Sequence, residues 1–406
     1  MGFTGYGMLL PVTNTFKSLK NGASITRTSL TASGLTISIS WTSTLYNPPD
    51  ELRVLYSTDR INWTIGAVTT VGTGSVSFSV NNGVTLYVAL SVPPTSTYIG
   101  YNELYAINSA VTVTNLYTFT TFTFTPIGAT GASGPTSLSG YGGSYPGVGT
   151  AYTLTLNAGI QQFIVPTTGA YSFTVVGAGN VYLSSSNSVK TGYGASLNIS
   201  TYNLTIGHVI QILVGQTGTG TAGAGGTFVY NLTTSTLLFA AGGAGGIGSE
   251  SNSGANSTVN ATLATTGQNG QVGAPVKAGT GGVGPAGGAV ATTFGYSFAD
   301  AGAGFSGNGA WNTKNGTLAN TSQSFLNGGK GSTNNGNVGG FGGGGCQGTY
   351  GGGVGGGGGG YGGGGAGGSD VSGAGGGGGG SFDITSAYSG NTTTNSGNGS
   401  VTITKL

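Results

Sequence analysis

Charged side chains are scarce in this sequence. Only 4% of the 406 residues are Asp, Glu, Lys or Arg, and the formal net charge is +2. The basic residues are scattered, so the chain lacks the Lys/Arg clusters that bind nucleic acid or an anionic membrane surface. No apolar run approaches the roughly 20 residues that a membrane-spanning helix needs. We therefore expect no nucleic-acid partner and no membrane insertion.

Groups suited to catalysis or metal binding are equally few. The single histidine, His208, lies in an apolar stretch typical of a strand, which excludes a multi-histidine metal site and argues against a Ser-His-Asp arrangement. Eight Asp and Glu residues leave a carboxylate pair open, but none stands in a recognisable catalytic motif. The Gly-x-Gly-x-x-Gly matches do not open a helix in a βαβ unit. We expect no enzyme activity, no catalytic residue, no cofactor and no bound metal.

The cysteine count and the N-terminal residues each argue against one feature. A single cysteine, Cys346, excludes an intramolecular disulfide framework. The first residues do not combine a basic stretch with an apolar one, so they do not read as a secretion signal.

Glycine dominates what is present, with 88 residues in total and 29 among the 42 residues from Gly339 to Gly380. Such a tract is either a flexible coil or an ordered array of polyproline-II-type helices, which have three residues per turn and need glycine wherever backbones touch on all sides. We predict the ordered array. Its predicted structural glycines are Gly342, Gly343, Gly344, Gly345, Gly355, Gly356, Gly357, Gly358, Gly359, Gly360, Gly362, Gly363, Gly364, Gly375, Gly376, Gly377, Gly378, Gly379 and Gly380.

The rest of the composition favours strands, because Thr, Ser and Asn replace the usual helix formers and no 3.6-residue periodicity is present. We predict an all-β chain. Residues 24–125 show short alternating runs with turn residues about every ten positions, so we predict an N-terminal β-sandwich over 1–125. Trp41 is its expected core aromatic, with a binding-surface role as the alternative. Residues 126–150, which contain three Gly-X-Y triplets, are predicted to be a linker.

Strand patterns resume over residues 152–241 and return once more over 399–405. A single strand has no stability alone, so we expect the last one to pair with the sheet formed before residue 241. Residues 151–406 then form one domain, with the glycine-rich section at about 242–396 as an insertion.

Four stretches of this domain carry a resemblance to a known family: 195–200 (ASLNIS), 207–216 (GHVIQILVGQ), 225–230 (GGTFVY) and 238–246 (LFAAGGAGG). Their order resembles the glycine-rich module of the ectodomains of anaplastic lymphoma kinase and leukocyte tyrosine kinase, which also occurs in surface proteins of large DNA viruses and phages. The resemblance runs in collinear pieces over residues 193–403. It implies a TNF-like β-sandwich with an inserted bundle of polyglycine helices.

The sequence also departs from those receptor modules. It has neither their membrane span nor their kinase, and one cysteine replaces several, so Cys346 is expected to be a free thiol. Receptor signalling is therefore not implied. We expect Phe341, Tyr350 and Tyr361 to pack against turns at the edge of the array, with stacking on a ligand as the alternative.

The features together favour a structural or adhesive surface protein of a particle assembled in the cytosol, namely a capsid-associated or fibre protein at the virion surface. Residues 1–125 would contact other structural proteins of the particle, and a host-surface protein or glycan is the expected external partner in host attachment. The alternative is a secreted or cell-surface binding module that recognises a protein or glycan. Homo-oligomerisation is open in both cases.

Overall fold

The computed structural model describes the strands of the first part of the chain, residues 15–17, 24–33, 36–43, 51–57, 64–70, 74–79, 85–92 and 103–112. Beyond them it describes residues 116–183, 189–248, 258–272, 277–290, 299–311, 320–334, 337–348, 353–368 and 373–406. These residues form antiparallel sheets, two short 3-10 turns and no α-helix, which confirms the predicted all-β class for the described part of the chain. None of its helical turns has the length and apolarity to cross a membrane.

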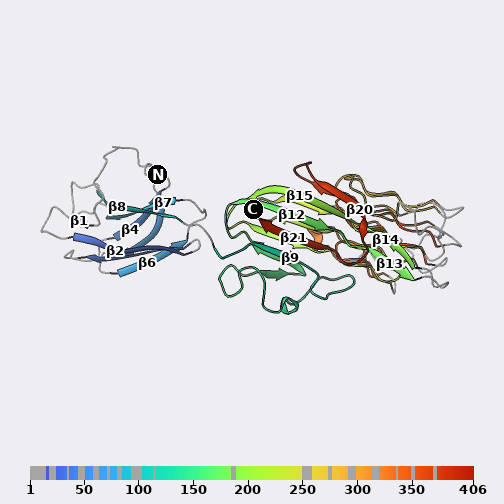
Figure 1. Cartoon of the computed structure of the whole chain (residues 1–406), viewed down its shortest axis with the longest axis horizontal. Helices are drawn as coiled ribbons and strands as arrows, with labels where there is room; N and C mark the ends of the chain where they lie inside the picture. The colour runs from blue at the N-terminus through green and yellow to red at the C-terminus, as the bar shows by residue number, and fades with distance from the viewer. Residues whose placement is uncertain are drawn as a thin grey trace. The chain divides into compact units, whose positions relative to one another are not determined.

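The chain divides into two compact units (Figure 1). The first contains Met1–Thr118 together with Val165–Thr168 and Thr205–Gly207. The second contains Phe119–Ile164, Gly169–Leu204 and His208–Leu406. Residues 126–150, which the sequence analysis assigns to a linker, therefore lie in the second unit.

Two four-stranded sheets make up the described part of the first unit, in the orders β1-β2-β3-β6 and β5-β4-β7-β8. Their strands are β1 (Thr15–Lys17), β2 (Ser24–Ser33), β3 (Thr36–Ser43), β4 (Glu51–Ser57), β5 (Thr64–Thr70), β6 (Gly74–Ser79), β7 (Thr85–Val92) and β8 (Glu103–Thr112).

The core of the first unit follows from the alternation of β3. Ile37, Ile39 and Trp41 are at most 2% exposed and share one face of the strand. On the other face, Ser38 exchanges a 2.7 Å hydrogen bond with Ser77 of β6. Tyr56 of β4 stacks on Phe78 of β6 with ring centroids 5.6 Å apart, which brings the two sheets into contact. Trp41 is thus a core residue, as predicted.

The second unit contains a six-stranded sheet, a five-stranded sheet and a two-stranded ribbon, in the orders β10-β11-β16-β17-β18-β19, β20-β15-β12-β21-β9 and β13-β14. Its elements are β9 (Thr121–Phe124), η1 (Ser139–Tyr141), β10 (Thr155–Asn157), β11 (Ile160–Ile164), β12 (Gly169–Val176), β13 (Asn180–Leu183), β14 (Val189–Gly192), β15 (Gly194–Leu204), β16 (Val209–Leu213), β17 (Thr227–Asn231), β18 (Thr236–Ala241), η3 (Phe325–Asn327), β19 (Phe382–Asp383), β20 (Ser389–Asn395) and β21 (Ser400–Lys405).

Aromatic side chains join the two large sheets of the second unit. Phe173 of β12 lies against Phe239 of β18 with centroids 4.9 Å apart, and Phe124 of β9 meets Phe163 of β11 edge-on at 5.8 Å. All four side chains are buried. Burial of such rings is a large share of the apolar area removed from water, so this core holds the two sheets together.

The last strand closes the unit. β21 pairs antiparallel with β12, with Phe173 opposite Ile403, and with β9 on its other side. This confirms the prediction that the final strand returns to the earlier sheet. The chain leaves the six-stranded sheet at Ala241 and rejoins it when Phe382 pairs with Ala240, earlier than the predicted boundary near 396. The next strand, β20, joins the five-stranded sheet and also precedes the predicted boundary. Its Ser/Thr/Asn-rich sequence lacks the apolar alternation by which a strand is predicted.

We predict that Ile403→Ala destabilises the second unit by about 2–5 kcal/mol, because it removes a fully buried side chain from the central closing strand. Its neighbour Thr402 only exchanges a hydroxyl hydrogen bond with Thr123 at the surface. Thr402→Ala should therefore cost less than about 1 kcal/mol. Denaturant unfolding of the full chain measures both; equal costs would contradict the placement of β21.

Candidate functional site: the glycine-rich segments

Between β18 and β19 the chain runs back and forth in extended segments that lie side by side (Figure 1, yellow to red). Segment 355–361 shows how they contact one another. Its first, fourth and seventh N–H groups donate to carbonyl oxygens of segment 373–380. The second and fifth N–H groups donate to segment 221–226, and the third and sixth donate to segment 299–304. The donor–acceptor distances are 2.8–3.2 Å. The hydrogen-bond partner therefore changes at every residue and repeats after three.

The carbonyl oxygens of this segment contact other neighbours. They accept hydrogen bonds from segments 242–248 and 362–368 and from Gly345, except that the Tyr361 carbonyl accepts one from Phe305, next to segment 299–304. Segment 355–361 is consequently surrounded by backbone from six other parts of the second unit. No strand in a sheet has this arrangement, because a strand pairs on only two sides.

Segment 362–368 repeats the pattern with partly different neighbours. From Gly363 onward, its N–H groups donate in turn to segments 286–290, 355–361 and 267–272, and the order then repeats. Its carbonyl oxygens accept from Gly279 and Gly282, among others. The three-residue repeat is thus shared by neighbouring segments.

Close backbone approach explains why these positions are glycine. A methyl group on Gly364 would overlap the carbonyl oxygen of Gly377, one on Gly358 that of Gly243, and one on Gly379 that of Gly359. The hydrogens on Cα instead face these oxygens, a contact that adds a small stabilisation of its own. A side chain at any of these sites requires backbone to move.

All 19 glycines predicted from the sequence lie in the described residues, and all are buried. Most of them meet backbone in the way just described. Gly342 and Gly343 differ in conformation, since their φ angles of 103° and 84° are open to glycine but strained for other residues. They turn the chain after Phe341.

Aromatic residues attach the glycine segments to the six-stranded sheet. Phe341 is fully buried in a cluster with Leu213, Phe228 and Phe325, and Tyr361 stacks on Phe382 of β19 at 4.7 Å. Packing at the edge of the glycine segments, as predicted for Phe341 and Tyr361, is confirmed. Tyr350 lies outside the described residues.

The Gly-X-Y stretch also joins the glycine segments. The carbonyl oxygen of Gly131 accepts a hydrogen bond from Phe341 N at 2.7 Å, and that of Ala132 accepts one from Gly331 N at 2.9 Å. The prediction of a linker over residues 126–150 did not anticipate these contacts. A glycine at every third position suits a three-residue repeat, which is a physical reason for the stretch to pack here.

A small polar cluster lies buried among the segments. One oxygen of Asp300 accepts hydrogen bonds from the Ser332 hydroxyl at 2.5 Å and the Asn334 amide at 2.8 Å, and the Cys346 thiol lies 3.3 Å from it. Asp300 and Cys346 are fully buried. Burial raises the pKa of the Cys346 thiol to about 12, and the nearby Asp300 charge adds to the shift. The thiol is free, as expected, and is held in its protonated form.

His208 and Asp383, which the sequence offered as possible catalytic groups, make hydrogen bonds to neighbouring side chains and backbone instead. His208 Nδ1 accepts a hydrogen bond from the Asn231 amide at 3.1 Å. Asp383 accepts bonds from Thr385 and from the amide of Ala387, closing the turn after β19. Within the described ranges, no three His, Cys, Asp or Glu side chains gather as metal ligands would.

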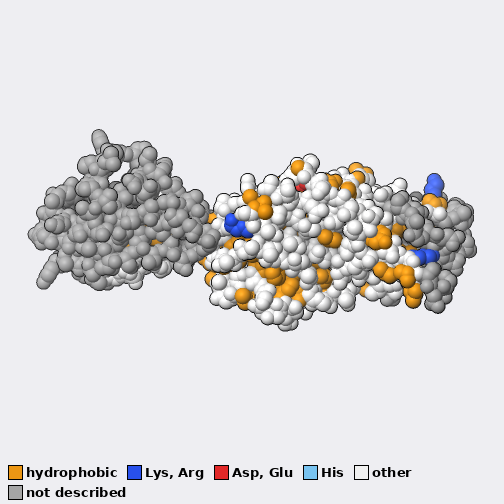
Figure 2. All heavy atoms as spheres, viewed as in Figure 1, with side chains coloured by type: hydrophobic (Ala, Val, Ile, Leu, Met, Phe, Trp, Pro, Cys, Tyr) orange, Lys and Arg blue, Asp and Glu red, His pale blue; other side chains and the backbone are white. Residues whose placement is uncertain are grey.

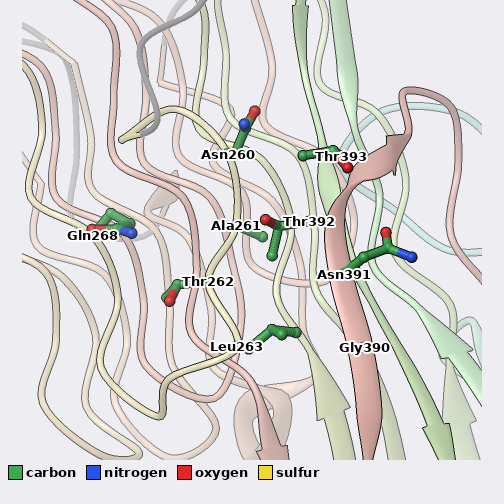
Figure 3. A pocket seen from close by; sticks show the side chains of 9 residues that line it. All are labelled: Asn260, Ala261, Thr262, Leu263, Gln268, Gly390, Asn391, Thr392 and Thr393. Atoms are coloured by element: carbon green, nitrogen blue, oxygen red, sulfur yellow. The ribbon is translucent and has the colours of Figure 1, made fainter.

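One feature was missed from the sequence. A groove of about 530 Å³ lies between residues 260–263 with Gln268 and residues 390–393 of β20 (Figure 3). Its walls come from two segments far apart in the sequence, and only the fold brings them together. Each wall contains an Asn-x-Thr sequon, at Asn260 and at Asn391. These two sequons were the available signal in the sequence.

No family model and no curated protein matches this sequence. The resemblance to the glycine-rich module therefore stays a prediction from the motifs themselves.

We predict that Gly364→Ala destabilises the second unit by about 1–3 kcal/mol or more, because the added methyl overlaps backbone that is itself hydrogen-bonded. Gly397→Ala is the matched control: its Cβ would meet only Asn395 Oδ1, at 3.9 Å. That variant should stay within about 0.5 kcal/mol of the parent. Denaturant unfolding measures the difference, and a similar small effect for both variants would contradict the packing described.

We further predict that stability falls as the pH rises from 9.0 toward about 12. In this interval the unfolded chain releases the Cys346 proton while the folded chain retains it, so the stabilisation present below pH 9.0 is lost. Tyrosines titrate in the same range, so the comparison is with Cys346→Ala, whose stability should decline less. Identical pH profiles for the two proteins would contradict the buried, protonated thiol.

Proposed function

We propose that the glycine-rich segments are polyglycine helices of the polyproline-II type, packed as a lattice. The support is the three-residue repeat of hydrogen-bond partners, since this helix has three residues per turn and leaves its backbone groups free to bond laterally. The 19 predicted glycines are then the structural residues of the lattice, because their Cα atoms meet neighbouring backbone.

In this proposal both units are β-sandwiches, and the second is TNF-like with the lattice inserted between β18 and β19. Ring contacts between paired sheets support the sandwich arrangement in each unit. The TNF-like character rests on the sequence resemblance to the glycine-rich module.

The function that fits this architecture best is that of a structural or adhesive surface protein of a particle, a capsid-associated or fibre protein of a virion. The observation that carries it is the backbone network around segment 355–361, which stabilises the unit through hydrogen bonds rather than through charge. Such cohesion depends little on salt and does not depend on disulfide formation, which suits a protein exposed outside a cell. The visible face of the second unit is mostly uncharged polar atoms and backbone, with scattered apolar side chains (Figure 2).

The two units take different roles in this proposal. The first contacts other structural proteins of the particle, and the second projects from the particle surface toward the host. A secreted or cell-surface binding module is the competing assignment, and it differs by existing free of any particle.

We predict that the protein copurifies with intact particles and that a membrane-impermeant amine reagent labels it there. Lys277 and Lys330, exposed side chains of the second unit, are the expected labelled sites. Peptide mapping of reagent-treated particles gives the readout, with particles opened by detergent as the control. Recovery only in particle-free medium would contradict the proposal and favour the secreted module.

The assignment of docking to the first unit has a separate test. Removal of residues 1–114 leaves β9 in place, which a cut at 125 would not, and β9 pairs with the closing strand β21. When the shortened chain is produced in place of the full chain, the particles should not incorporate it. Its normal incorporation would show that the second unit carries the attachment.

A further inference from the structure

The groove beside β20 lies at an edge of the five-stranded sheet, since β20 is the terminal strand in the order β20-β15-β12-β21-β9. In Figure 3 the strand forms one side of the groove, and residues 260–263 with Gln268 form the other. A strand edge next to a separate segment gives a concave surface with two independent walls.

The β20 wall contains a bulge. Asn395 is opposite Gly194 and Asn391 is opposite Ser196, so residues 392–394 include two extra positions relative to the partner strand. The Thr394 hydroxyl donates to Asn391 Oδ1 at 2.8 Å and ties the two ends of the bulge together. Bulges interrupt the ladder and redirect side chains, and they are frequent next to binding sites.

The opposite wall is fixed from behind by hydrogen bonds. Asn260 Oδ1 accepts from Tyr193 N at 3.0 Å, and the Thr262 carbonyl accepts from the Ser381 hydroxyl at 2.7 Å. The Tyr388 hydroxyl donates to the Leu263 carbonyl at 2.8 Å. This wall therefore needs no ordering when a ligand binds, which lowers the entropic cost of association.

Several polar groups of the groove are left for a ligand. The side-chain amide of Gln268 and the hydroxyls of Thr392 and Thr393 make no hydrogen bond with any described residue. Asn391 uses its oxygen in the bulge, which leaves the amide nitrogen as a donor. The lining contains no ionisable side chain, and Leu263 adds an apolar surface between the polar groups.

We propose that this groove binds a neutral oligosaccharide. Sugar hydroxyls both donate and accept hydrogen bonds, as do the amides and hydroxyls here, and the C–H faces of a sugar ring suit Leu263 and the threonine methyl groups. A charged ligand would find no counter-charge in the lining. The inference deepens the proposed function, on which it rests, by assigning the host-surface partner to an uncharged glycan and its site to β20.

Glycine at position 390 keeps the groove open. A Cβ there would lie 2.5 Å from the Ser196 carbonyl oxygen and 3.1 Å from a methyl of Leu263. A side chain at this position would displace the Leu263 wall, so the shape of the groove depends on this residue.

The test applies the full chain to an array of neutral hexose and N-acetylhexosamine oligosaccharides beside sialylated and sulfated ones, at low and high salt. We expect binding to neutral members only, unchanged by salt. The triple variant Gln268→Leu, Thr392→Val, Thr393→Val keeps side-chain volume but removes the free polar groups. It should lose at least about tenfold in affinity for the neutral glycan.

The matched control is Thr201→Val, the same substitution at an exposed position of β15, which should bind as the parent does. Near-ultraviolet circular dichroism checks that each variant is folded. Absence of binding to every neutral glycan, binding confined to charged glycans, or full binding by the triple variant would overturn the groove assignment. None of these results affects particle copurification, so the proposed function would stand or fail separately.

Discussion

A buried peptide group must find a hydrogen-bond partner, and in the second unit the partners of many glycines are other glycines. Segment 355–361 donates and accepts around its whole circumference, which no strand in a sheet does. This arrangement requires Cα atoms close to neighbouring carbonyl oxygens, and any Cβ would prevent it. The high glycine content is therefore a packing requirement of this unit rather than a sign of a flexible tether.

Glycine-only segments carry little information about their own register, because a shift by three residues would bring equivalent groups to the same partners. The side chains among them supply that information. Asp300 binds Ser332 and Asn334 inside the array, while Phe341 packs at its base. Pairing of Ala240 with Phe382 brings both ends of the excursion to adjacent strands. Buried polar contacts are well suited to selecting one arrangement among near-equal ones.

The sequence allowed a substantial part of this fold to be predicted. Composition alone indicated an all-β chain, Trp41 was assigned to a core, and the lone strand at 399–405 required a partner in the earlier sheet, which β12 provides. Other features depended on contacts between distant segments. The docking of Gly131 and Ala132 and the early return at β19 follow from neighbours that no local pattern encodes. The groove could not be predicted from the sequence for the same reason, since Thr262 and Thr392 line one groove only in the folded chain.

Hydrogen–deuterium exchange of the native full chain tests the central claim most directly. The amides of segments 355–360 and 376–380 should exchange as slowly as those of β12 and β21, because each is buried and bonded to a neighbouring backbone. Exchange across these segments at the rate of an unstructured peptide, with β12 and β21 still protected, would contradict the account.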